Sequence, residues 1–340
     1  MEITTIGLDL AKHWFQVHGI NNEGSVIVRK RLRRAEVLGF FAELPPCLVG
    51  IEACATAHHW AREIARAGHQ VKLMPPAYVK AYVRRGKNDA TDAEAICEAV
   101  RRPNMRFVAV KGLDQQAFLM LHRSRELLVR QRSMSACAIR AHLAEFGIIA
   151  PQGRNRVDQL AAYLEGEEGN QVPLLARETL RLLIDQLGDL SGRIAVLEAE
   201  LAKLHRIHPI AQLLSTIPGV GPITSTALVA TVPDPSVFRS GREFAAWIGL
   251  TPRQNSSGGK ERLGRITKKG DVYLRHLLVI GARNIVRFPK ARAMFGAAWI
   301  DRLLGRRRPM VVAVAVANKM ARIIWAMMTT GECYRRASAG

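Results

Sequence analysis

The chain has 340 residues, with 50 Lys and Arg against 29 Asp and Glu, so its formal net charge is +21. Hydrophobic residues make up 48% of the chain, which excludes global disorder and allows a substantial core. A globular chain this basic usually binds a polyanion, because Lys and Arg gain affinity by displacing counterions from phosphates. The length indicates two or three domains.

The positive charge is concentrated at one end. Residues 1–110 have a net charge of +5 and residues 111–208 of +1, whereas residues 239–340 carry 21 basic and 5 acidic groups, a net of +16. Solubility requires a net charge of only about 2–8 in a small domain. The excess therefore indicates a nucleic-acid-binding surface in the last third of the chain.

Three other classes are disfavoured. The 5 cysteines are an odd number and form no CxxC pair, so we expect free thiols in a reducing cytosol rather than a zinc site or a disulfide framework. The N-terminal ITTIGLDLA is typical of a strand and not of a signal peptide. Polar residues at 318, 319 and 322 interrupt the apolar run Met310–Met328, which predicts a buried helix and no contact with a membrane.

The first 110 residues alternate short β-type runs with turns and helices, which predicts an α/β domain with a mixed sheet. We expect strands over 3–10, 14–20, 25–30, 47–52 and 70–74, and helices over 36–43, 58–67 and from residue 89.

Residues 111–210 predict a long helical, coiled-coil region, with helices over 113–147 and 174–207. Near-heptad spacing of Ile194, Leu197, Leu201 and Leu204 indicates an antiparallel pair or a coiled coil between chains. A helical hairpin that packs on its own domain explains the pattern equally well. Residues 211–340 predict a mainly helical C-terminal domain with glycine-rich turns.

Four acids occur where strands end or a helix begins. Asp9 ends a strand in GLDLAK, Glu52 ends another in VGIEAC, and Asp89 and Asp92 open a helix in KNDATDAEAI. The i, i+3 spacing places both aspartates on one helix face, and ligands bind at the carboxyl ends of strands in open α/β sheets. Such carboxylates can hold two divalent cations about 4 Å apart, and oxygen ligands favour Mg²⁺ or Mn²⁺.

Each acid also has an ordinary structural interpretation. Asp89 can cap a helix, Asp92 can be a first-turn acid favoured by the helix dipole, and Glu52 can be a buried ion-pair partner. The set as a whole favours a metal site. Nearby basic residues favour one that faces phosphate, namely Lys80, Arg84, Arg85 and Lys87.

The stretch Phe244–Leu278 contains the loop sequence SSGG, with Ser256 and Ser257, in a strongly basic segment. Its basic residues are Arg253, Lys260, Arg262, Arg265, Lys268 and Lys269. A serine in such a field can attack a phosphodiester, because cations stabilise the charge of the transition state. From the residues alone, a loop that only binds phosphate is favoured, since no His or Asp stands beside the serines as a base.

A turn at Ile217–Pro222, IPGVGP, joins two helical runs. It resembles a helix-hairpin-helix turn, in which Gly219 and Gly221 would offer backbone N–H groups to a DNA phosphate without reading bases. An ordinary glycine turn is the alternative.

Taken in order, GLDLAK, VGIEAC, KNDATDAEAI, IPGVGPITSTAL and GLTPRQNSSGGKERLGRITKKGD resemble the motifs of the DEDD-type transposases of bacterial insertion sequences. This is the family of recombinases guided by a bridge RNA, and the resemblance covers essentially the whole chain. It implies an RNase H-like (RuvC-like) domain over 1–110, the helical region over 111–210 and a transposase domain over 211–340.

The resemblance also implies roles for residues. Asp9, Glu52, Asp89 and Asp92 match the family's metal ligands, and Ser257 matches its nucleophile, with Ser256 as the adjacent alternative. It implies a covalent link from serine to the DNA 5′ phosphate, with the acids of one protomer combined with the serine of another. That composite site is a hypothesis, in which metal-bound groups or the partner's carboxylates activate Ser257.

The sequence therefore predicts an insertion-sequence transposase that acts as an RNA-guided DNA recombinase. The expected partners are donor and target DNA, a guide RNA and further copies in a dimer or tetramer, in the bacterial cytoplasm at the nucleoid. Two alternatives are a junction-resolving nuclease that uses the four acids and water, and a non-catalytic nucleic-acid-binding protein. The intact acids and SSGG loop argue against the second.

Overall fold

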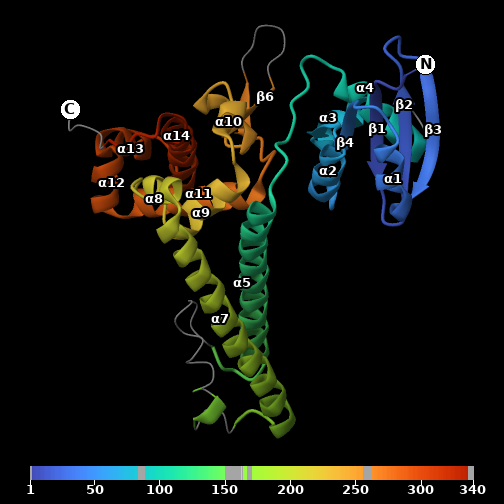
Figure 1. Cartoon of the computed structure of the whole chain (residues 1–340). Coiled ribbons are helices and arrows are strands. Elements are labelled where there is room, and N and C mark those ends of the chain that lie inside the picture. Colours follow the sequence, from blue (N-terminus) through green and yellow to red (C-terminus); the bar gives the residue numbers. More distant parts are fainter. Residues whose placement is uncertain are drawn as a thin grey trace. The chain divides into compact units, whose positions relative to one another are not determined.

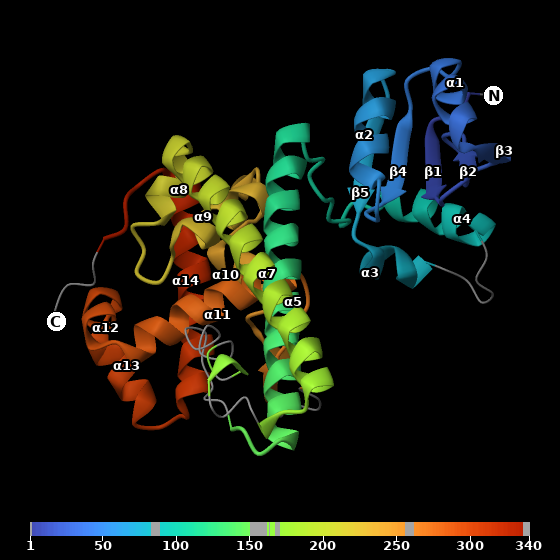
Figure 2. The ribbon, with the colours of Figure 1, turned by 90° about the horizontal axis from the view of Figure 1, so that it is seen from below.

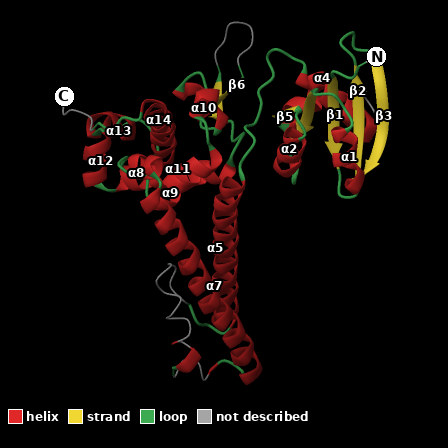
Figure 3. Ribbon diagram, viewed as in Figure 1, coloured by secondary structure: helices red, strands yellow, loops and turns green. Residues whose placement is uncertain are grey.

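The structure is a computed structural model that describes residues 2–82, 89–149, 162, 164–166, 171–255 and 262–335. The chain divides into two compact units, Met1–Gln115 and Gln116–Gly340 (Figure 1). Among the described residues, strands lie in the N-terminal unit except for one short hairpin in the C-terminal unit (Figure 3).

The N-terminal unit contains a mixed five-stranded sheet with the strand order β3-β2-β1-β4-β5. The strands are β1 (Thr5–Leu10), β2 (Trp14–Ile20), β3 (Val26–Arg33), β4 (Leu48–Glu52) and β5 (Gln70–Met74). β1 pairs antiparallel with β2 and β2 with β3, whereas β1, β4 and β5 run parallel. The predicted mixed sheet is confirmed, and β3 continues beyond its predicted end at residue 30.

Helices cover both faces of this sheet (Figure 2). They are α1 (Val37–Ala42), α2 (Ala57–Arg66), α3 (Pro76–Val79) and α4 (Asp89–Val100). Because side chains alternate along a strand, Ile6 and Leu8 of β1 point to one face, where they pack with α1 and α2. Gly7 points to the other face, towards α4.

The contact between α4 and the sheet requires glycine. A Cβ atom at Gly7 would lie 2.1 Å from the carbonyl oxygen of Ala93 and 2.7 Å from the Cβ of Cys97. A Cβ atom at Gly50 of β4 would lie 2.8 Å from the Cβ of Val100. The two glycines therefore allow the helix to lie directly on β1 and β4.

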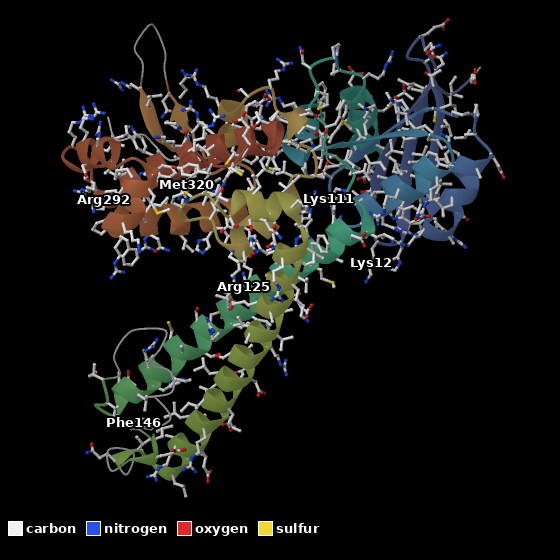
Figure 4. All side chains as sticks on the ribbon, turned by 60° about the vertical axis from the view of Figure 1, so that its left-hand side comes forward. Lys12, Lys111, Arg125, Phe146, Arg292 and Met320 are labelled. Atoms are coloured by element: carbon white, nitrogen blue, oxygen red, sulfur yellow. The ribbon has the colours of Figure 1, made fainter. Side chains whose placement is uncertain are left out.

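The C-terminal unit begins with two long helices, α5 (Leu113–Glu145, whose first residues belong to the N-terminal unit) and α7 (Leu174–Ile207). The side chain of Arg125, early in α5, donates to Glu198, late in α7, at 2.6 and 2.9 Å. At the other end, Ile139 of α5 shares a buried cluster with Leu187 of α7. The helices are therefore antiparallel (Figure 4, where Arg125 lies near the C-terminal helices and Phe146 at the far end of the pair).

The near-heptad face of α7 packs inside the chain. Ile194 and Leu201 are 2% and 0% exposed, respectively. This outcome agrees with the antiparallel-pair and hairpin alternatives, and these residues need no second chain to become buried.

The remaining elements form a helical core with one β-hairpin. They are α8 (Pro209–Leu214), α9 (Pro222–Thr231), α10 (Gly241–Trp247), β6 (Pro252–Gln254), β7 (Leu263–Ile266), α11 (Val272–Arg287), α12 (Pro289–Phe295), α13 (Ala297–Leu304) and α14 (Pro309–Thr330). The predicted mainly helical C-terminal region is confirmed. The serine segment was expected to be a loop, but the structure has the β6–β7 hairpin there. The strand residues of this hairpin are nearly all exposed, so the sequence lacks the alternation of apolar and polar residues that predicts a strand.

In the described part of the chain, α14 alone is long and apolar enough to cross a membrane by length and composition. Its residues Val316, Ala317 and Met320 are 0% exposed and belong to the core with α11 and α10. This agrees with the predicted buried helix, since a core helix has the same composition.

The close contact at Gly7 leads to a stability prediction. Gly7→Val is expected to lower the free energy of unfolding of the N-terminal unit by at least about 2 kcal/mol, because the new side chain meets helix backbone that cannot move aside. Gly39→Ala is the matched control: no atom lies within 4 Å of its would-be Cβ, and alanine in helix α1 should stabilise by about 0.5–1 kcal/mol. Chemical denaturation followed by circular dichroism measures both; equal effects would contradict the prediction.

Candidate active site

Asp9 and Glu52 lie side by side at the same edge of the sheet. In the parallel pair of β1 and β4, Leu8 is opposite Ile51, and each acid is the next residue of its strand. Both side chains are partly buried. By the alternation of strand residues, Asp9 shares the face of Gly7, and Glu52 shares the face of Gly50, which is the face that α4 covers.

Asp89 and Asp92 form the first turn of α4. Ala93, whose carbonyl oxygen touches Gly7, is one turn beyond Asp89. The helix that is seated on Gly7 therefore has its acidic first turn close to Asp9, two residues along the strand. The sequence predicted two of the acids at strand ends and two at a helix start, and the observed strands β1 and β4 and helix α4 agree with this.

The electrostatics of Asp9 show that the other three carboxylates act on it. The pKa of Asp9 is raised to about 6, first by burial and then by repulsion from Asp92, Asp89 and Glu52. The pKa of the nearby Cys54 thiol is also raised, first by burial and then by Glu52 and Asp9. Burial and like charge destabilise the ionised form of this carboxyl. A bound cation would stabilise that form, so the surroundings of Asp9 favour cation binding.

The donor set fits a hard cation, because it consists of carboxylate oxygens. Among the described residues, however, no three His, Cys, Asp or Glu side chains are already gathered closely enough to hold a metal ion. The four carboxylates would have to converge further to share one. Their roles as metal ligands and catalytic groups therefore stay predictions.

The hairpin β6–β7 carries the predicted serine segment. Its tip is not described, so Ser256, Ser257 and Lys260 lie outside the described residues. The stem is closed by the N–H of Asn255, which donates to the carbonyl oxygen of Arg262 at 2.9 Å. The other predicted basic residues around it are exposed, namely Arg253, Arg262, Arg265, Lys268 and Lys269.

A buried arginine that the sequence did not single out fastens the base of this hairpin. Arg275 of α11 is 9% exposed and donates to the carbonyl oxygens of Ile248 at 2.7 Å and Lys269 at 3.0 Å. Gly249 and Gly270, both with positive φ, approach backbone atoms in the same place. The base of the hairpin is therefore held by buried contacts.

A groove of about 1470 Å³ lies beside the hairpin, with α14 along its wall. None of its described lining residues is acidic, and its basic ones are Arg242, Arg265, Lys268, Lys319 and Arg322. Three of these, Arg242, Lys319 and Arg322, were missed in the sequence because they are far apart along the chain. Because these cations lie together in the fold, the electrostatic potential around the described part of the hairpin is strongly positive.

The turn between α8 and α9 gives its two glycines different roles. Gly219 has φ +82°, and its would-be Cβ lies 2.7 Å from the carbonyl oxygen of Gly281 in α11. Packing therefore accounts for Gly219. Gly221, just before α9, has no atom within 4 Å of its would-be Cβ. A phosphate contact at either glycine stays a prediction.

Comparison with known proteins agrees with this arrangement. Residues 6–148 match the DEDD transposase family of IS110 elements, described as "Transposase", and residues 211–295 match the "Transposase IS116/IS110/IS902 family". The chain is 48% identical to the "Probable family 20 transposase" of Pseudomonas aeruginosa over 98% of this chain and 99% of that one. It is 42% identical to the "Transposase for insertion sequence element IS1328" of Yersinia enterocolitica over 98% and 99% of the two chains.

A third relative, the "Transposase for insertion sequence element IS1111A" of Coxiella burnetii, is 38% identical over 98% of this chain and 92% of its own. The acidic strand ends, the basic hairpin and these full-length matches define an insertion-sequence transposase. The chain belongs to the IS110/IS116 family of these enzymes, and membership implies DNA cleavage and strand transfer.

The raised pKa of Asp9 predicts a pH-dependent stability. Because folding raises this pKa from 3.8 to about 6, the stability that the protonated form contributes is complete below about pH 4 and is lost as the pH rises through 6. With a chelator present, Asp9→Asn is expected to increase the free energy of unfolding at about pH 7.5 by about 1 kcal/mol, a value reduced for partial exposure. At about pH 4 it should change little.

Denaturant titrations at the two pH values measure this difference. Glu43→Gln serves as the control, since Glu43 is exposed at the end of α1, on the face of the sheet opposite to Asp9. A loss of stability in Asp9→Asn of the same size at both pH values would show that the carboxylate is a structural partner and not a strained charge.

Proposed function

We propose that this transposase is an RNA-guided recombinase that cuts and rejoins DNA through a covalent link to Ser257. In the proposed step, the Oγ of Ser257 attacks a phosphorus atom of DNA, the bond from phosphorus to the 3′ oxygen breaks, and a 5′-phosphoserine and a free 3′ hydroxyl result. Attack by a 3′ hydroxyl of another strand reverses the step and releases the serine. The observation that carries the proposal is the placement of Asp9 and Glu52 at one edge of the sheet beside the acidic first turn of α4.

The acids would hold Mg²⁺ or Mn²⁺, since oxygen ligands from Asp9, Glu52, Asp89 and Asp92 suit these ions. When bound, such a cation supplies activation of an oxygen and stabilisation of charge during in-line displacement. The chain's own part is to bring the carboxylates together and to move a proton. The proton of the Ser257 hydroxyl would pass to one of these carboxylates as general base.

The basic hairpin and its groove would provide the other half of the site. The exposed cations Arg253, Arg262 and Arg265 lie on or beside the strands of the hairpin, so they would stabilise charge that develops on a phosphate bound there. No described acid lines the groove beside them. In line with the resemblance of this chain's motifs to the DEDD-type transposases, the serine of one protomer would work with the acids of another.

The broader proposal follows the predicted organisation. It includes an RNase H-like domain over 1–110, a helical coiled-coil region over 111–210 and a transposase domain over 211–340. It also includes donor and target DNA, a guide RNA and action at the nucleoid in the bacterial cytoplasm. Sequence choice would come from RNA pairing, because phosphate contacts carry no base information.

The alternative is a metal-dependent junction-resolving nuclease in which water replaces the serine. The acid cluster alone suffices for that reaction. A covalent adduct separates the two mechanisms, because hydrolysis leaves none.

The decisive experiment is a search for that adduct. Purified full-length protein with its co-purified RNA is expected to form a denaturant-resistant complex with element-end DNA, and Ser257→Ala is expected to lose it essentially completely. Gel electrophoresis of labelled DNA measures the complex. Ser256→Ala is the matched control and should keep it, whereas persistence of the adduct in Ser257→Ala would contradict the assignment.

The same assay tests the metal and the RNA. Asp9→Ala with Glu52→Ala should abolish the adduct, and full activity in that variant would exclude the acid site. RNase treatment before DNA is added should remove adducts at specific sites. Sequencing of the co-purified RNA should then identify one RNA from the flank of the element, and random cellular RNA would contradict guidance.

Exposed apolar residues support the proposed oligomer. Met120, Leu127 and Met134 of α5 are 63%, 44% and 66% exposed and are spaced by seven residues. Leu175, Leu182 and Val196 of α7 lie seven and fourteen residues apart, with the exposed Asp189 at the position between the last two, and are 77%, 71% and 63% exposed. Such stripes are typical of helices that pair with a second copy, and the net charge of only +1 over residues 111–208 opposes pairing little.

A charged residue in this stripe should break the oligomer. Met120→Glu with Met134→Glu is expected to lower the mass measured by light scattering to that of a smaller assembly, because burying the new carboxylates is unfavourable. Ser133→Glu, exposed on the same helix but about 100° away from Met134, is the control and should leave the mass unchanged. An unchanged mass in the double variant would contradict assembly through this face.

A further inference from the structure

A row of polar side chains runs across the sheet from its basic edge to the acids. Asp9 of β1 is paired with Gln16 of β2, and Gln16 is paired with Arg31 of β3. Cross-strand neighbours point to the same face of a sheet, so all three lie on the face of Gly7. Adjacent strands are about 4.8 Å apart, which places Arg31 about 10 Å from Asp9, roughly three nucleotides of rise along a duplex strand.

Helix α4 covers the neighbouring row and leaves this one accessible. In the neighbouring row, Gly7 is in contact with α4, His18 is 5% exposed, and Arg29 forms a salt bridge of 3.7 Å with Glu94 of α4. Beyond the acidic first turn of α4, Gln16 is only partly buried and Arg31 is exposed. Within the part of the chain that the structure describes, the accessible part of the face therefore begins at the acids and ends at the edge strand β3.

An exposed tryptophan organises the basic end of this row. Trp14 of β2 is 37% exposed and is paired with Arg33. The guanidinium of Arg31 lies 4.6 Å from the centre of the Trp14 ring, and that of Arg33 lies 5.5 Å from it. Neither guanidinium forms a salt bridge with an acid among the described residues. Two cations are thus held beside an aromatic ring with their donors available.

Protection of the sheet edge does not explain this arrangement. Charges on an edge strand prevent pairing with other strands whichever face they occupy. Here Arg29, Arg31 and Arg33 occupy the face of the acids, whereas Lys30 faces the other way, towards Phe40. A cluster of four carboxylates repels the phosphates on which it acts, and cations on the same face compensate for that repulsion.

We propose that Trp14, Arg31 and Arg33 form a binding track for the backbone of the DNA strand that the acids act on. The arginines bind phosphates about three nucleotides from Asp9, and Trp14 holds them in place and packs against the sugar or base between them. The track rests on the proposed function of the acids. DNA is its ligand because the track is continuous with Asp9, which belongs to the DNA-cleaving site of the proposal.

Cross-linking from the track tests this inference in the full-length protein. Trp14→p-benzoylphenylalanine is expected to cross-link a labelled DNA duplex or single strand on irradiation, because the track contacts the strand directly. Lys30→p-benzoylphenylalanine, on the neighbouring strand β3 with its side chain on the opposite face of the sheet, is the control and should cross-link only at background level, because its side chain points away from the track. Equal yields, stronger cross-linking to RNA of the same sequence, or cross-links to a second copy of the chain would overturn the proposal.

A charge-matched pair of variants provides the second measurement. Arg31→Gln with Arg33→Gln is expected to flatten the slope of log affinity against log salt by up to about 2, since each phosphate contact contributes about 0.9. Lys30→Gln with Arg66→Gln removes the same charge from the exposed surface elsewhere and should leave the slope unchanged. Equal slopes in the two double variants would overturn the proposal.

The outcomes separate this inference from the proposed function. If the serine adduct forms normally but position 14 yields no cross-link, the track is wrong and the recombinase proposal stands. If position 14 cross-links DNA but no serine adduct forms, the track is a DNA site and the recombinase proposal fails.

Discussion

The contact of helix α4 with strand β1 at Gly7 determines where the acids lie. Two carboxylates come from strand ends, and their relative position follows from the parallel register of β1 and β4. The other two belong to a helix that must be seated close to the sheet to reach them. With no side chain at Gly7, backbone atoms of Ala93 and Cys97 approach the strand directly, and the first turn of the helix is brought to the strand ends.

This placement has an electrostatic consequence that shapes the N-terminal unit. Burial, and then the like charges of the other acids, raise the pKa of Asp9, so the ionised form of this carboxyl is destabilised in the folded chain. A cation relieves the repulsion among the acids, but it does not attract a long polyanion to the surface around them. The modest net charge of +5 over residues 1–110 is compatible with both needs, because basic residues such as Arg31 are concentrated at one edge of the sheet.

The sequence predicted the helices and strands well, but it did not show which residues far apart in the chain come together in the fold. Strand 14–20, strand 70–74 and helix 174–207 have the predicted bounds, because each has a clear periodicity and is bounded by turn residues. The acids were found because carboxylates at strand ends are unusual for packing. Arg275 and Arg242 were missed, since a buried arginine or a groove-lining one has no local pattern. The β6–β7 hairpin was missed because its stem is exposed on both faces.

The division of charge between the units also limits which mechanism is possible. The cations near Ser257 in the sequence can stabilise a bound phosphate. No His or Asp stands beside the serine in the sequence to act as its base. The four carboxylates offer proton acceptors, but residues 1–110 have a net charge of only +5, against +16 over residues 239–340. Phosphoryl transfer to a serine needs both a proton acceptor and stabilisation of the developing charge. Either set alone is therefore suited to half of the reaction, and a mechanism that uses Ser257 must bring an acidic set and a basic hairpin to the same phosphate.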